Sequence, residues 1–110
     1  MAATAKDVVW LSGQVKTPPF STEARLEAGM LLRQLQRGTK LTMPQSRSMP
    51  TVGARCHELR IQDRGTSWRI VYRVDTDAIV ILEVFKKDGQ RAPKSAIANS
   101  KRRLSAYDNC

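Results

Sequence analysis

Cysteine and histidine are scarce in this chain of 110 residues. The two cysteines are Cys56 and the last residue, Cys110, and the one histidine is His57. Neither their number nor their spacing suits a disulfide framework or a zinc site, since both need several such residues at short intervals. We therefore expect reduced thiols and a protein that uses neither a metal ion nor a cofactor.

Long apolar runs are also missing. None approaches the roughly 20 residues of a membrane-spanning helix, and the first residues lack the basic and apolar regions of a signal peptide. A chain of this length usually forms one domain with one modest core. We expect a single cytoplasmic domain over residues 1–110 that makes no contact with a membrane.

Acidic residues are few compared with basic ones. Nineteen Lys and Arg against ten Asp and Glu give a net charge of +9 and a pI near 10.3. Such a charge predicts attraction to polyanions, with nucleic acid as the leading candidate. A membrane surface is less suitable, because the basic residues do not gather on one amphipathic helix.

Hydrophobic periodicity divides the chain into strands and helices. Apolar residues spaced three and four apart, with Ser21 as N-cap and Gly38 beyond the end, predict a helix over residues 22–37. Short β-branched runs separated by turn-forming residues predict an antiparallel meander of three strands. In chain order the predicted elements are a strand at 8–12, the helix at 22–37, an irregular connection at 38–53, strands at 55–62, 67–74 and 79–85, and a helix from 93 to about 107.

Strand alternation sorts the side chains of the meander onto two faces. The apolar face should carry His57 and Tyr72; His57 fits a buried, hydrogen-bonded histidine better than a general base, and Tyr72 lies near enough to the edge to reach a nucleotide. The other face should be solvated. Four charged residues share it and are followed by three more at the end of the last strand: Glu58, Arg60, Arg69 and Arg73, then Lys86, Lys87 and Arg91. This grouping predicts a surface that binds anions and polarises a phosphodiester.

Several short motifs follow one another in order over about forty residues. They are Glu58-Leu59-Arg60, Trp68-Arg69-Ile70-Val71-Tyr72, Phe85-Lys86-Lys87 and Pro93-Lys94. In this order they resemble the phage Gp49-like, HigB-type branch of the RelE/ParE toxin superfamily. The resemblance covers nearly the whole chain and implies an α+β fold in which a small twisted antiparallel sheet, made of an N-terminal strand and the meander, has its helices packed on one side.

The resemblance also implies a function. Members of this superfamily are toxins of type II toxin-antitoxin systems, and the RelE and HigB branches are endoribonucleases that cut mRNA in the ribosome without a metal ion and so block translation. A partner is implied as well, namely an antitoxin with a helix-turn-helix domain that masks the basic face. The oligomeric state is left open.

Individual residues take roles from the same resemblance. Arg69 matches the family's strand arginine and is the first candidate to hold the scissile phosphate, with Arg60 second. Glu58, the carboxylate that faces these arginines, is the candidate general base. Lys86 or Lys87 would stabilise the transition state or donate a proton. Further RNA contacts are expected from Arg55, Tyr72, Arg73, Arg91 and Lys94.

Two other functions remain open on the sequence. The ParE branch of the superfamily inhibits DNA gyrase by binding it and needs no catalytic residues. A net charge of +9 would also suffice for a nucleic-acid-binding module without enzymatic activity.

Overall fold

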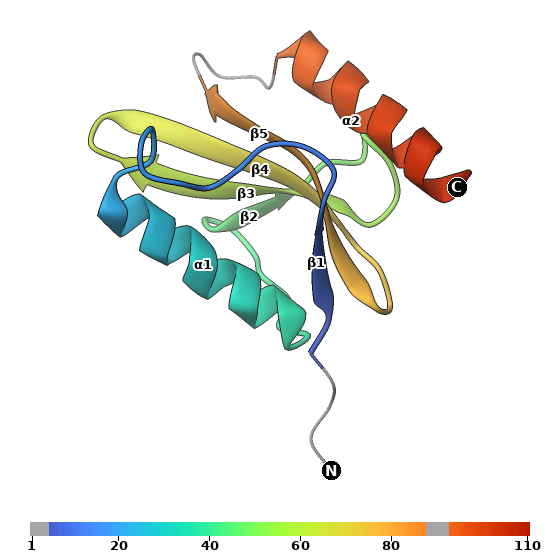
Figure 1. Cartoon of the computed structure of the whole chain (residues 1–110), viewed down its shortest axis with the longest axis horizontal. Coiled ribbons are helices and arrows are strands. Elements are labelled where there is room, and N and C mark those ends of the chain that lie inside the picture. Colours follow the sequence, from blue (N-terminus) through green and yellow to red (C-terminus); the bar gives the residue numbers. More distant parts are fainter. Residues whose placement is uncertain (1–4, 88–92) are drawn as a thin grey trace.

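The computed structural model describes residues 5–87 and 93–110, in which five strands form one sheet with two helices packed against it (Figure 1). The predicted α+β class and the three-stranded meander are confirmed. The elements are β1 (Asp7–Trp10), α1 (Thr22–Gln36), β2 (Ser46–Ser48), β3 (Cys56–Asp63), β4 (Thr66–Val74), β5 (Ala78–Lys87) and α2 (Lys94–Asp108). No helix in the described ranges is long and apolar enough to cross a membrane.

The strands lie in the order β1-β5-β4-β3-β2. The meander pairs are antiparallel, β2 is antiparallel to β3, and β1 runs parallel to β5, so the sheet is mostly rather than wholly antiparallel. The segment predicted as irregular therefore contains a strand. β2 has only three residues and no apolar alternation, and it is held by its pairing with β3 and by a 2.6 Å hydrogen bond between the Ser46 and Tyr72 hydroxyls.

Helix α1 forms where the sequence predicts it. Ser21 caps its start by accepting a hydrogen bond from the Ala24 amide at 3.1 Å, and its apolar stripe packs on one face of the sheet. Phe20, just before the helix, stacks on Trp68 of β4 with ring centroids 4.2 Å apart. The buried helix residues are Ala24, Ala28, Leu31, Leu32 and Leu35.

Helix α2 packs on the opposite face, so the expectation that the helices share one side is wrong (Figure 1). Leu104 of α2 joins a second buried cluster with Val80 and Leu82 of β5. Arg103 donates to the Leu82 carbonyl at 2.8 Å and lies 3.2 Å from the Glu83 carboxylate. The reason is the composition of β5, which is apolar on both faces and therefore needs a cover on each.

Candidate nucleic-acid interface

The face that α2 partly covers is also the face of the charged strand residues. Arg60 of β3 lies opposite Arg69 of β4, and Glu58 of β3 lies opposite Val71, one diagonal step from Arg69. Residues on one face at such positions are within reach of each other across neighbouring strands. The predicted gathering of Glu58, Arg60 and Arg69 is therefore present.

Glu58 and Arg69 form a buried ion pair at the centre of this group. Arg69 Nε lies 3.3 Å from Glu58 Oε1, and the two side chains are only 3% and 4% exposed. Arg69 Nη1 donates to the carbonyl of Trp68 at 3.1 Å, whereas Nε has no hydrogen-bond partner among the described residues. Burial lowers the pKa of Arg69, and the charge of Glu58 opposes that shift.

The expectation of a solvated arginine on this face is thus wrong for Arg69. The residue opposite it on β5 is Phe85, whose ring packs with the cluster beneath α2. Sequence alternation placed Arg69 on the correct face. It did not show that the same face lies against a helix, because that depends on where α2 docks.

A β-bulge decides which of two adjacent lysines joins the group. The ladder between β4 and β5 shifts between Val71 and Tyr72, so that Val71 pairs with Glu83 and Tyr72 with Ile81. A bulge inserts one extra residue and reverses the alternation beyond it. As a result, the last residues of β5 exchange faces relative to a regular strand.

Beyond the bulge, Lys87 lies on the face of Arg69, and Lys86 lies on the α1 face. Lys86 pairs with Trp68, whose ring belongs to the α1 core, and Lys87 pairs with Ser67. The pKa of Lys87 is lowered, first by burial and next by the charge of Arg69. Of the two predicted acid–base lysines, the geometry brings only Lys87 to the charged face.

Two further arginines surround the pair. Arg60 is half-buried, and its Nη1 lies 3.6 Å from the sulfur of Met43. Arg47 of β2 is exposed and lies opposite Glu58 in the ladder. The charges of both arginines add to the lowering of the Lys87 pKa. We name Arg47, Arg60 and Lys87 the basic rim.

Arg47 is the member of the basic rim that sequence reasoning missed. It lies in the segment predicted to be irregular, and the polar run Ser46-Arg47-Ser48 has no apolar alternation from which a strand could be inferred. The local sequence of this segment offers only a basic residue flanked by two serines, which does not predict a strand. Its place beside Glu58 follows from strand pairing, which is a long-range contact.

Arg73 lies on the same face but serves a different purpose. Its guanidinium donates to both oxygens of Asp75, at 2.8 and 3.0 Å, and to both oxygens of Asp108, at 2.9 and 2.8 Å. These hydrogen bonds raise its pKa, and only 9% of the side chain is exposed. Arg73 therefore attaches the end of α2 to the sheet, and we leave it out of the basic rim.

Of the remaining predicted RNA contacts, Tyr72 and Arg55 are not brought together with the basic rim. Tyr72 is 1% exposed and faces α1, so its ring has no surface for a base to stack on. Arg55 is exposed, donates to the Val74 carbonyl and pairs with Asp75 at 3.3 Å. Lys94 is exposed at the first residue of α2, and Arg91 lies outside the described residues.

A family model described as "Phage derived protein Gp49-like (DUF891)" matches residues 19–105. The chain belongs to the Gp49-like family. The predicted family is thereby confirmed. Comparisons with curated proteins and with solved structures gave no match.

The Gp49-like match includes every residue of the buried pair and the basic rim, from Arg47 to Lys87. Within residues 5–87 and 93–110, no three His, Cys, Asp or Glu side chains lie close enough together to hold a metal ion. Arg47, Arg60 and Lys87 offer this face guanidinium and ammonium groups, which bind phosphate oxygens and, in the case of lysine, also transfer a proton.

Proposed function

We propose that this Gp49-like protein is the toxin of a type II toxin-antitoxin system and acts as a ribosome-dependent, metal-independent endoribonuclease that cuts mRNA. The RelE- and HigB-type resemblance of its motifs supports the toxin assignment. One observation carries the nuclease assignment. Lys87, with a lowered pKa, shares a sheet face with three arginines, two of which belong to a partly exposed rim.

Cleavage of RNA without a metal ion begins when the 2′-hydroxyl gives up its proton to water and its oxygen attacks the adjacent phosphate. The P–O bond to the 5′-oxygen breaks, a 2′,3′-cyclic phosphate forms, and the leaving oxygen takes up a proton. Arg47 and Arg60 are suited to bind the phosphate oxygens and to stabilise the charge that develops on them. Lys87 is suited to donate the proton, because a lowered pKa brings an ammonium group closer to the working pH.

The buried ion pair of Glu58 and Arg69 influences the pKa of Lys87. The positive charge of Arg69 is the second cause of the lowered Lys87 pKa, after burial. Glu58 holds Arg69 in place, and with 3% of its side chain exposed it is better suited to this positioning role than to contact with a 2′-hydroxyl. We therefore assign Glu58 and Arg69 as positioning residues beneath the basic rim, in place of the general base and phosphate ligand expected from the sequence.

Two adjacent lysines allow a matched test. Lys87→Gln and Lys86→Gln remove the same charge from neighbouring positions on opposite faces of β5. In a reconstituted translation reaction, with message cleavage mapped by primer extension, we expect Lys87→Gln to slow cleavage by about 10²-fold or more, the scale of a lost general acid. Lys86→Gln should stay within about twofold of the parent protein. Equal effects of the two variants would refute the assignment.

The same protein preparations distinguish the proposed nuclease from the two other candidate functions. Inhibition of gyrase supercoiling at stoichiometric amounts, with message left intact on the ribosome, would favour a ParE-like inhibitor. Binding of RNA with message left intact would favour a module without enzymatic activity. Cleavage that requires the ribosome and is lost in Lys87→Gln is the result that we expect.

An antitoxin partner belongs to the same proposal. A segment that masks the basic rim would need carboxylates to face Arg47, Arg60 and Lys87, since a carboxylate on each would replace the phosphates of RNA. The helix-turn-helix protein expected from the family would supply that segment. Co-expression of the neighbouring reading frame, followed by loss of cleavage and recovery of one complex, would test the partnership.

A further inference from the structure

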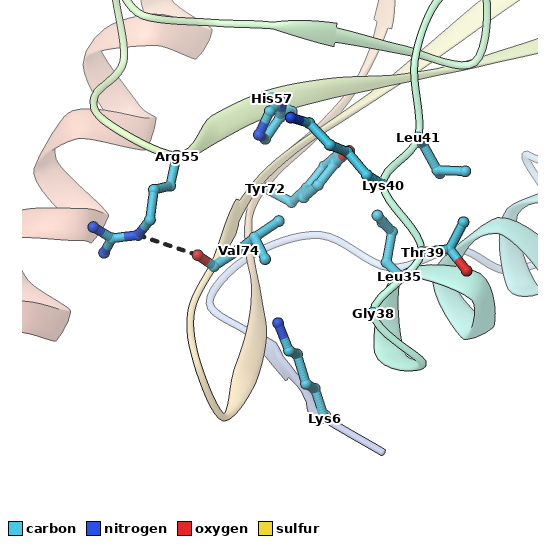
Figure 2. A pocket seen from close by; sticks show the side chains of 10 residues that line it. All are labelled: Lys6, Leu35, Gly38, Thr39, Lys40, Leu41, Arg55, His57, Tyr72 and Val74. Carbon is cyan, nitrogen blue, oxygen red and sulfur yellow. Dashed lines mark hydrogen bonds between the residues drawn. The ribbon is translucent and has the colours of Figure 1, made fainter. Parts of the chain in front are cut away.

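A cavity of about 350 Å³ opens on the α1 face, on the far side of the sheet from the basic rim (Figure 2). It lies between the last turn of α1, the loop that follows it, the start of β3 and the end of β4. Its volume falls in the range of pockets that bind small organic molecules. None of the functions discussed so far uses it.

The inner wall of this cavity is largely apolar. His57 and Tyr72 stack on each other with ring centroids 5.4 Å apart and an angle of 25° between their planes. Leu35, Leu41 and Val74 complete the wall. The partly exposed His57 ring beside aliphatic side chains favours an apolar ring as the body of a ligand.

Three basic side chains stand around the opening, and no carboxylate from residues 5–87 or 93–110 lines the cavity. They are Lys6, Lys40 and Arg55. Figure 2 shows the Lys40 amine beside the His57 ring and the Lys6 side chain pointing toward Val74. The described residues give neither lysine an ion-pair partner, whereas Arg55 is engaged by the Val74 carbonyl and by Asp75. Two unpaired ammonium groups above an apolar wall favour a ligand with negative charge.

His57 itself contributes the ring face rather than a charge. Burial, followed by the charge of Lys40, lowers the pKa of His57 below its ordinary value of 6.5. The imidazole is therefore neutral at pH 7. The positive charge of the cavity then comes from Lys6, Lys40 and Arg55 alone.

We propose that this cavity binds a small organic anion, a planar ring system bearing a carboxylate or phosphate group, with the ring against His57, Leu35 and Val74 and the anionic group beside the Lys40 amine. This inference stands apart from the proposed nuclease activity. The cavity and the basic rim lie on opposite faces of the sheet, so either assignment can fail alone.

His57 provides a clean reporter, because it is the one histidine in the chain. The full-length protein is titrated with 1-naphthoate and, as a matched neutral probe, 1-naphthamide, while the imidazole signals are followed by NMR. We expect a saturable shift with 1-naphthoate and at least about tenfold weaker binding of the amide, as loss of one close charge interaction predicts. 1-Naphthyl phosphate distinguishes phosphate from carboxylate as the preferred group. Binding of either anion supports the inference.

Lys40→Gln should weaken 1-naphthoate binding by about three- to tenfold, and raised salt should weaken it further. The control is Lys101→Gln, which removes the same charge from the exposed surface of α2 and should leave binding unchanged. The inference is overturned if the amide binds as well as the acid, if the two variants weaken binding equally, or if no saturable shift occurs up to about 10 mM, where the binding free energy is below about 3 kcal/mol.

Discussion

Replacing Glu58 with glutamine keeps the size of the side chain and removes the charge that faces Arg69. The two side chains are 3% and 4% exposed, so the guanidinium would be left buried without a counter-charge. Loss of one partner from a buried ion pair costs about 3–5 kcal/mol. The contact from Arg69 Nε to Glu58 Oε1 is 3.3 Å long and is not a hydrogen bond, so we expect the lower end of that range, about 3 kcal/mol.

A double variant distinguishes the cost of leaving one buried charge unpaired from the net contribution of the ion pair to the free energy of unfolding. Arg69→Met alone leaves a buried carboxylate and should likewise cost about 3 kcal/mol. Glu58→Gln together with Arg69→Met leaves no buried charge and should cost at least about 2 kcal/mol less than the sum of the single changes. For a chain of this size, the loss in Glu58→Gln corresponds to a fall in Tm of roughly 10–20 °C.

Urea unfolding followed by tryptophan fluorescence measures these differences, since Trp68 neighbours Arg69 in the chain. Arg60→Met is the control, because Arg60 lies opposite Arg69 in the ladder, is half-buried and has no carboxylate partner among the described residues. It should change the free energy of unfolding by less than about 1 kcal/mol. If Glu58→Gln and Arg69→Met cost no more than this control, or if their costs simply add, the pair does not lie in the low-polarity setting inferred from its burial.

Two further predictions concern stability. The pKa of His57 is lowered in the folded state, so between pH 6.5 and that lowered pKa the unfolded chain binds more protons than the folded one. The free energy of unfolding should therefore fall as the pH drops through this window. Urea unfolding at several pH values should show a smaller dependence of that free energy on pH for His57→Gln. Gly13 and Gly38 both have positive φ, at +81° and +89°, but a Cβ at Gly13 would lie 2.6 Å from Val84 Cγ2 whereas one at Gly38 meets nothing within 4 Å. Each Ala variant should lose about 1–2 kcal/mol to backbone strain, and Gly13→Ala should lose about 1–3 kcal/mol more by overpacking; equal losses in urea unfolding would contradict the close approach.

Local patterns in the sequence were enough to predict the main helices and strands. The stripe of apolar residues in α1 and the turn residues between β3, β4 and β5 act over a few positions, so periodicity and turn chemistry report them directly. The same holds for the faces of β3 and β4. Alternation correctly grouped Glu58, Arg60 and Arg69.

The candidate site depended on contacts between segments distant in the chain. Arg47 reaches the group because β2 pairs with β3, although its own sequence carries no strand pattern. Lys87 rather than Lys86 faces Arg69 because a bulge in β5 reverses the alternation. A bulge leaves no reliable mark in a strand that is apolar on both faces, so regular alternation would have selected Lys86.

What the sequence by itself determined is the set of elements other than β2, the antiparallel meander, the family and the positive charge. What only the tertiary structure decided is the burial of Arg69, the attachment of α2 by Arg73 and the cavity between α1 and β4. The physical reason lies in β5, whose two apolar faces each require a cover but do not specify which helix provides it. In the folded chain Glu58 and Arg69 form a buried pair on the face that alternation alone would leave exposed, and the basic rim of Arg47, Arg60 and Lys87 remains around it.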